Sequence, residues 1–249
     1  LTDATKVAFE KAEKVAFEIN MEEMSDMSVI FSLMGKIMMS GGTTLKDLLS
    51  EEDYAFVEKK FNEMGLPIAM LGRMKPMFLS TFASGADSGG DTGGGGGMGG
   101  LLGGGGDMVS YEMKFMEMAQ GDNKEMAGLE TIEFQLSMFD SIPYEAQAEM
   151  LVESLKANNN GNDQLKDMVN LYKNQDIEGM QKMFDAEEGG LDGYQDLLLV
   201  KRNENWIPIM KEMMMTKSTF FAVGAGHLGG KKGVIDLLRQ AGYKMKPLY

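Results

Sequence analysis

A glycine-rich run follows residue 84 and limits what can fold on either side of it. Fourteen of the 23 residues from Gly85 to Asp107 are glycine. A segment of this composition has no periodic apolar face and loses much conformational entropy on ordering, so it predicts a flexible insertion. It lacks the Lys-Ser or Lys-Thr step that ends a phosphate-binding loop. The core therefore has to come from residues 1–84 and 108–249.

Composition excludes several classes of function. The chain has 38 acidic and 24 basic residues, a formal net charge of −14, which argues against nucleic acid or an anionic membrane as partner. It has no Cys, which excludes disulfides, thiolate zinc sites and Cys nucleophiles, and it has one His. The longest apolar run, Val29 to Met39, is too short to form a transmembrane helix. With 43% hydrophobic residues, the chain can still bury a sizeable core.

Apolar periodicity predicts a helix-rich chain with a few short strands. The predicted strands are Val15–Ile19, Glu125–Leu129, Thr219–Val223 and Tyr243–Leu248. The predicted helices are Ala4–Lys14, Met27–Met39, Thr131–Phe139, Tyr144–Leu155, Asp163–Lys173, Ile177–Asp185, Leu191–Met213 and Lys232–Gln240. Two capping boxes, opening at Thr44 and Ser50, predict further helix starts. The sequence thus predicts an α/β (α+β) fold, with a small mixed sheet covered by many helices and a carboxyl-terminal βαβ unit.

The 26 methionines allow two interpretations. Met21, Met24 and Met27, or the run Met213–Met215, could hold a soft ion such as Cu(I) through thioethers. Methionine also fills irregular core space in place of leucine. The core interpretation is favoured because the methionines follow helical apolar positions.

A second glycine motif follows the predicted strand Thr219–Val223. Gly224, Gly226 and Gly229 match the Gly-x-Gly-x-x-Gly pattern of dinucleotide-binding folds. That pattern needs an acidic residue about 20 positions further on. The chain offers Lys244 and Lys246 there, so dinucleotide binding is disfavoured.

The same glycines could instead let the backbone turn and place His227 at the carboxyl edge of the sheet, where open α/β sheets bind ligands. A neutral imidazole at that edge can be a metal ligand or a general base. It can equally cap a helix or bond a backbone carbonyl. The residues alone leave these alternatives open.

Four segments of the chain together carry a resemblance to a known family. The most specific is the carboxyl-terminal segment TFFAVGAGHLGGKKGVIDLLRQAGYKMKPL. The others agree in order, namely VAFEINM, AGLETIEFQLSMFDSIPYEAQAEML and LLLVKRNENWIPIM. These segments resemble the TraB/GumN family, which includes the Tiki-type metalloproteases. The resemblance implies one domain over residues 1–249, with residues 85–107 as a glycine-rich insertion.

The family's described activity is that of metal-dependent peptidases with two Gly-x-x-His motifs and a glutamate. By resemblance, Glu18 and His227 are ligands of a divalent ion (Mn²⁺, Co²⁺ or Zn²⁺), and Glu130 and Arg202 assist catalysis. Supporting residues are Gly224, Gly226 and Asn203. From the residues alone, Glu18 could be a surface carboxylate and Glu130 a helix cap, while Arg202 and Asn203 could lie on a solvated helix face.

The resemblance carries further expectations about the whole protein. The other Gly-x-x-His motif is expected before Leu1, so residues 1–249 alone are expected to show little hydrolysis. The expected substrate is a peptide or protein, and the expected location is a bacterial envelope. The alternative is a non-catalytic envelope protein of the same fold that binds a peptide.

Overall fold

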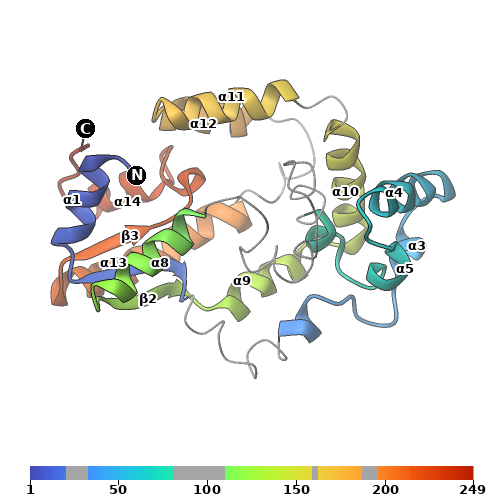
Figure 1. Cartoon of the computed structure of the whole chain (residues 1–249), viewed down its shortest axis with the longest axis horizontal. Helices are drawn as coiled ribbons and strands as arrows, with labels where there is room; N and C mark the ends of the chain where they lie inside the picture. Colours follow the sequence, from blue (N-terminus) through green and yellow to red (C-terminus); the bar gives the residue numbers. More distant parts are fainter. Residues whose placement is uncertain (21–32, 81–109, 159–161, 187–193, 195, 249) are drawn as a thin grey trace. The chain divides into compact units, whose positions relative to one another are not determined.

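The computed structural model describes residues 1–20, 33–80, 110–158, 162–186, 194 and 196–248, and the chain divides into two compact units. One unit contains residues 1–29, 111–135 and 165–249, and the other contains residues 30–110 and 136–164. The α/β class is confirmed, since helices surround a small sheet (Figure 1). The predicted insertion, residues 85–107, lies outside the described residues, and the single-domain organisation stays a prediction.

The sheet of the first unit contains three parallel strands in the order β2-β1-β3. They are β1 (Lys14–Ile19), β2 (Glu125–Glu130) and β3 (Thr219–Ala222). Val15 of the central strand pairs with Met126 on one side and Phe220 on the other. Three of the predicted strands are therefore confirmed. The predicted mixed character of the sheet is wrong among the described strands, because both pairings within the sheet are parallel.

The predicted last strand, Tyr243–Leu248, is also wrong, so the carboxyl-terminal βαβ unit does not close. This segment has no regular structure. Tyr243 and Met245 are partly buried against a core cluster beneath the sheet, whereas Lys244 and Lys246 are not part of that cluster. The alternation that predicted a strand thus comes from an extended segment lying on the core, without pairing to β3.

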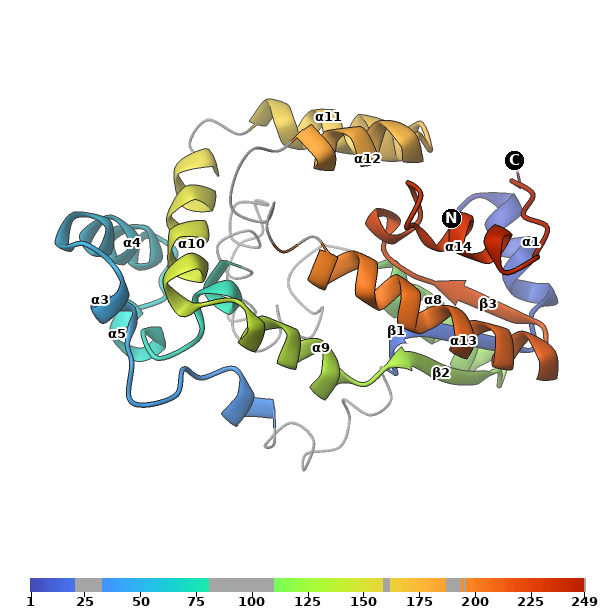
Figure 2. The same cartoon turned by 180° about the vertical axis from the view of Figure 1, so that it is seen from behind.

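Helices cover both faces of the sheet (Figures 1 and 2). On one face α1 (Asp3–Lys11) and α8 (Tyr111–Gly121) form a core with β1, comprising Phe9, Val15, Phe17, Phe115 and Ala119. On the other face α13 (Lys201–Thr216) and α14 (Val234–Gln240) form a core with β2, comprising Leu129, Trp206, Met210, Val234 and Leu238. Apolar side chains on both faces explain why the strands are read as continuous apolar runs.

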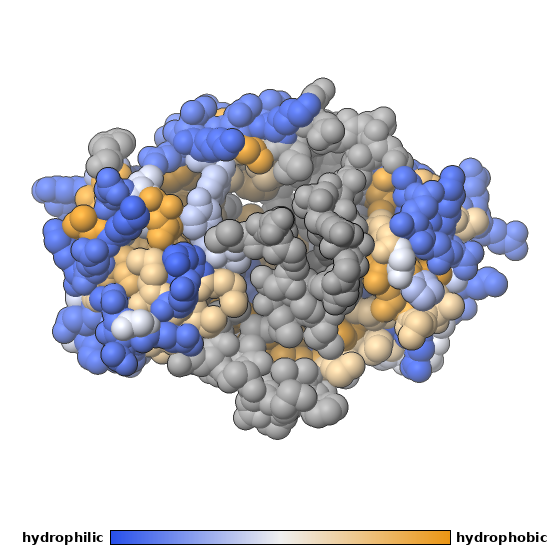
Figure 3. All heavy atoms as spheres, in the orientation of Figure 1, coloured by the Kyte–Doolittle hydropathy of each residue, from blue (hydrophilic) through white to orange (hydrophobic). Residues whose placement is uncertain are grey.

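Shorter elements surround the carboxyl edge of the sheet. A five-residue π-helical segment, Asp196–Val200, leads directly into α13. A 3₁₀ turn, η4 (Ala225–His227), follows β3. Helices α11 (Asn162–Lys173) and α12 (Ile177–Ala186) precede them in the chain. Their outward surface is mostly hydrophilic (Figure 3).

The second unit is helical among its described residues. Its helices include α3 (Leu45–Leu48), α4 (Glu51–Glu63), α5 (Ile68–Leu71) and α10 (Tyr144–Asn158). Residues 33–36 and 76–80 are also helical, and the 3₁₀ turn η2 covers Phe139–Ser141. Helix α9 (Ile132–Met138) begins at the last residues of the first unit. The starts predicted at Thr44 and Ser50 are confirmed, because each residue is the N-cap of a helix. Of the predicted Met27–Met39 helix, residues 33–36 are helical within the described part.

Five of the 21 methionines whose structure is described are buried, and six more pack partly buried against a core cluster. Met39, Met74, Met138, Met180 and Met210 are buried. In the run 213–215 the first two side chains pack partly buried on the core, while the third is 84% exposed. The run therefore supports core filling more than a shared thioether site, and residues 21–27 lie outside the described residues. None of the described helices is both long and apolar enough to cross a membrane.

Gly128 on β2 provides a test of how closely β1 and β2 pack. A Cβ at this position would lie 2.6 Å from the Asn20 amide nitrogen and 2.9 Å from the Glu130 carbonyl oxygen. We expect Gly128→Ala to lower the free energy of unfolding by roughly 2 kcal/mol, because backbone atoms would have to move. Urea denaturation measures this. Gly121→Ala is the control, since no atom lies within 4 Å of its Cβ position, and equal midpoints for the two variants would contradict the expectation.

Candidate functional site

The three parallel strands end at one edge of the sheet, and each brings a polar group there. Glu18 lies next to the end of β1, Glu130 is the last residue of β2, and the turn after β3 carries His227. The Gly224 amide donates a hydrogen bond of 2.8 Å to Glu18 Oε1, which ties the turn to β1. Parallel pairing thus gathers residues that are far apart in the sequence.

Arg202, on the first turn of α13, lies at the centre of this cluster. Its Nη2 donates to Glu18 Oε2 and to Glu130 Oε1, both at 2.6 Å. Its Nε donates to the two Glu130 oxygens at 3.0 and 3.2 Å. Its Nη1 donates to the Leu198 carbonyl at 3.3 Å and contacts His227 Nε2 at 3.1 Å. All five N–H donors of the guanidinium therefore have protein acceptors.

These contacts determine the tautomer of His227. Arginine has no acceptor, so His227 Nε2 must accept from Arg202, and the ring proton must lie on Nδ1. His227 Nδ1 then donates to Asn203 Oδ1 at 2.7 Å. The Asn203 Nδ2 group donates to the Lys232 carbonyl at 2.9 Å, which fixes the amide orientation. His227 is thus held neutral, with its Nε2 lone pair directed at Arg202.

Burial disfavours the charged forms of both His227 and Arg202, but neighbouring charges shift the pKa values of the two groups differently. Burial is the largest influence on His227 and lowers its pKa to about 4; the charge of Glu18 opposes this shift and that of Arg202 adds to it. Burial also disfavours the charged guanidinium of Arg202, but hydrogen bonds and charges from Glu130 and Glu18 outweigh it, so the pKa of Arg202 is raised. The site therefore contains one guanidinium, two carboxyl groups and a neutral imidazole.

Trp206 is a member of this cluster that the sequence analysis missed. It is fully buried, and its Nε1 donates to Glu130 Oε2 at 3.0 Å. Its ring lies 4.5 Å from the His227 ring, and the Arg202 Cζ lies 4.9 Å from the Trp206 ring centroid. Its position four residues after Arg202, on the same helix face, was the available signal.

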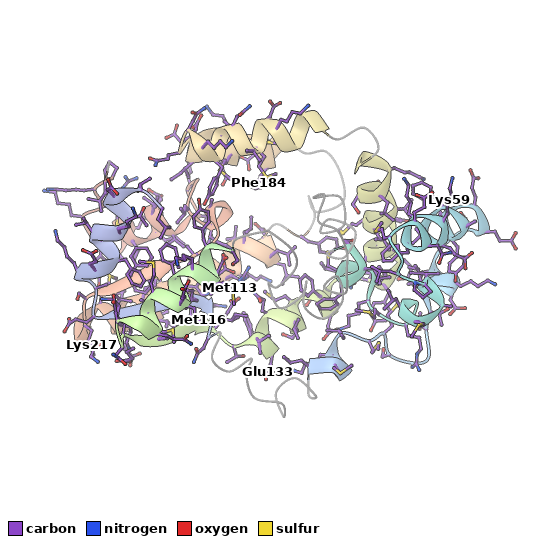
Figure 4. The ribbon with its side chains drawn as sticks, viewed as in Figure 1. Lys59, Met113, Met116, Glu133, Phe184 and Lys217 are labelled. Atoms are coloured by element: carbon purple, nitrogen blue, oxygen red, sulfur yellow. The ribbon has the colours of Figure 1, made fainter. Side chains whose placement is uncertain are left out.

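The glycines of the motif have different uses. A Cβ on Gly224 would lie 3.2 Å from Glu18 Oε1, so glycine helps this amide approach the carboxylate. A Cβ on Gly226 would be 3.5 Å from the Phe184 ring, an ordinary contact. Figure 4 shows Phe184 pointing from α12 toward the turn. A Cβ on Gly229 would lie 2.8 Å from Ile177, so α12 packs closely against this loop.

The structure brings the predicted site residues together. The cluster contains Glu18, Glu130, Arg202, Asn203 and His227, with Gly224 joined through its amide. Two alternative interpretations are wrong. Arg202 and Asn203 are buried at 7% and 2% exposure, so they do not form a solvated face. Thr131, rather than Glu130, accepts the amide hydrogen bond that caps the next helix. The catalytic and ligand roles stay predictions.

The cluster satisfies only part of what a metal ion requires. His227 Nε2 and Glu18 Oε1 have suitable chemistry and lie 3.9 Å apart, compared with roughly 3.3 Å for two tetrahedral ligands on one zinc ion. Among the described residues, however, no three His, Asp or Glu side chains are grouped to hold an ion. Arg202 also occupies the His227 Nε2 lone pair. Two donors therefore fit, provided that Arg202 moves.

Comparison of the sequence with known proteins identifies a family. The sequence profile of the TraB/PrgY/gumN family matches residues 1–247. The metalloprotease TIKI2 of Xenopus tropicalis is 46% identical over 57 residues, and this stretch covers 21% of the present chain and 11% of TIKI2. No solved structure gives a significant match.

The lowered pKa of His227 predicts a pH-dependent stability. Between pH 6.5 and about 4 the unfolded chain binds a proton that the folded His227 does not, so stability falls as the pH drops through this window. We expect His227 to account for a loss of roughly 2 kcal/mol between pH 7 and pH 5. Urea denaturation in chelator measures the loss for the wild type and for His227→Gln, which cannot titrate. Equal losses in both proteins would contradict the prediction.

Proposed function

The chain belongs to the TraB/PrgY/gumN family, and from this premise we propose that it is a metal-dependent, peptidase-type hydrolase. The observation that carries the proposal is the convergence of Glu18, Glu130 and His227 at the carboxyl edge of a parallel sheet. The partial similarity to a protein named as a metalloprotease supports the same class. A peptide or protein is the proposed substrate. Export to a bacterial envelope stays a prediction.

Glu18 and His227 are the proposed ligands from this chain. Glu18 is the most open carboxylate of the cluster, with 24% of its side chain exposed against 4% for Glu130. A divalent ion (Mn²⁺, Co²⁺ or Zn²⁺), when bound, supplies Lewis acidity toward a peptide carbonyl and makes a water more acidic. Asn203 keeps the His227 proton on Nδ1, so that Nε2 carries the lone pair that would bind the ion once Arg202 releases it.

Glu130 and Arg202 assist by positioning. Both Glu130 oxygens already accept hydrogen bonds from Arg202 and Trp206, and the Arg202 donors are all used. Neither side chain has a free group directed at a substrate in this arrangement. Their contribution is to fix Glu18 and His227 in place, as supporting residues do around many metal sites.

A second candidate function is peptide binding without catalysis, in a protein of the same fold. The observation that favours it is the complete pairing of Arg202 and Glu130, together with the absence of a three-donor group among the described residues. This alternative predicts that a peptide binds without being cleaved.

Peptide cleavage distinguishes the two functions. The product of the whole gene, rather than residues 1–249 alone, is incubated with a quenched fluorescent peptide library in Mn²⁺, Co²⁺ or Zn²⁺, with and without chelator. We expect chelator-sensitive cleavage that Glu18→Gln and His227→Ala each reduce about 100-fold, since each removes a ligand atom. Glu117→Gln is the matched control, because Glu117 is exposed and pairs only with Lys114 among the described ion pairs. Peptide binding without cleavage would favour the alternative, and full activity in both site variants would refute the proposed ligands.

A further inference from the structure

The Arg202 guanidinium contacts side chains from all three polar positions at the sheet edge. Its acceptors include Glu18 Oε2, Glu130 Oε1 and His227 Nε2, at 2.6, 2.6 and 3.1 Å from its nitrogens. Two of these acceptors belong to the residues proposed as metal ligands. A guanidinium and a divalent ion would therefore both use His227 Nε2 and the Glu18 carboxylate, which Arg202 contacts through Oε2.

The His227 contact makes the competition direct. An imidazole nitrogen without a proton has one lone pair, in the plane of the ring. Because arginine can only donate, the Arg202–His227 hydrogen bond uses that lone pair. An ion bound to Nε2 would need the same lone pair and would also be repelled by the guanidinium at this short distance.

The contacts of Arg202 allow its guanidinium to lose the His227 hydrogen bond while it stays bound to Glu130. Its Nε and Nη2 atoms hold Glu130, which Trp206 also fixes from the other side. Its Nη1 has a second acceptor in the Leu198 carbonyl, on the π-helical segment before α13. A small rotation of the guanidinium can therefore break the His227 contact while the Glu130 pair remains.

We propose that Arg202 is a resident cation that competes with a divalent ion for Glu18 and His227, so that ion binding and the Arg202–His227 hydrogen bond exclude each other. This inference rests on the proposed function. It assigns Arg202 as a positioning residue that sets the metal affinity of the site. The apparent affinity of the wild-type protein is then lower than its ligand atoms alone would give, because the guanidinium has to be displaced first.

Metal titration of charge-balanced variants tests this competition. Arg202→Met combined with Glu130→Gln removes one positive and one negative charge, which limits the cost of leaving a buried carboxylate unpaired. The single variant Glu130→Gln is titrated as well, so that the effect of losing the Glu130 charge is measured separately. The control is Lys217→Met combined with Glu125→Gln, which removes an exposed ion pair of 2.6 Å at the other end of β2.

Calorimetry with Zn²⁺ or Co²⁺ alone gives the dissociation constants, and circular dichroism with thermal unfolding establishes that each variant folds. We expect the Arg202→Met/Glu130→Gln protein to bind at least about tenfold more tightly than the wild type. The surface double variant should bind as the wild type does. Should the site double variant fail to fold, Arg202→Lys takes its place, because an ammonium lacks the fork that reaches all three acceptors, and tighter binding is again expected.

Trp206 gives a second readout that does not depend on activity. It is the only tryptophan of the chain and contacts both Arg202 and His227. Zn²⁺ has no absorption band that overlaps tryptophan excitation or emission, so a change in Trp206 emission on titration reports a change in the surroundings of its ring. We expect a saturable change in the wild type, with the same midpoint as calorimetry, and a smaller change in the Arg202→Met/Glu130→Gln protein.

The outcomes separate this inference from the proposed function. If the wild type binds an ion and the Arg202 variants bind equally or more weakly, the competition is refuted while metal dependence stands. If no variant binds an ion, both are refuted. If only the Arg202 variants bind and the wild type cleaves peptides in chelator, the competition is supported and metal dependence is refuted.

Discussion

The buried ion pair between Arg202 and Glu130 is the interaction on which the rest of the site depends. Only 9% of the Arg202 side chain and 4% of the Glu130 side chain are exposed. A buried charge is costly unless it is fully paired, and removing one partner of such a pair typically costs about 3–5 kcal/mol. The pair therefore constrains the distance between α13 and the end of β2. Glu18 and His227 take their positions from the same guanidinium.

A chain of hydrogen bonds extends this constraint to the loop after β3. Asn203 follows Arg202 on α13 and holds His227 Nδ1, and the Lys232 carbonyl holds Asn203 in turn. Trp206, one helical turn after Arg202, donates to Glu130, and its ring contacts the His227 ring at a tilt of 44°. One turn of one helix thus sets the position of a carboxylate, an imidazole and a backbone loop. This explains why so few residues can define a site gathered from distant segments.

Local patterns predicted most of the elements and the identity of the site residues, but not their relations. Three apolar runs predicted β1, β2 and β3, because a strand buried on both faces is recognisable from sequence. The Tyr243–Leu248 segment was wrongly predicted to be a strand. Alternation shows which side chains are buried, but it does not show whether the backbone pairs with a neighbouring strand. The resemblance implies that Arg202 assists catalysis, but it does not show that all the donors of Arg202 are used within the protein. That saturation depends on contacts across 72 and 184 positions, which no local pattern contains.

Arg202 also places a cation between the two carboxylates of the cluster. Glu18 and Glu130 approach from neighbouring strands, where Ile19 pairs with Glu130, and two carboxylates brought together in a poorly solvated place repel unless a cation lies between them. A divalent ion could meet that need only while it is bound. Arg202 meets it permanently, because its guanidinium is covalently part of α13. The guanidinium that holds Glu18 and His227 in position therefore also occupies their acceptor atoms. The contacts that stabilise the folded site also set the free energy needed to release these atoms from Arg202.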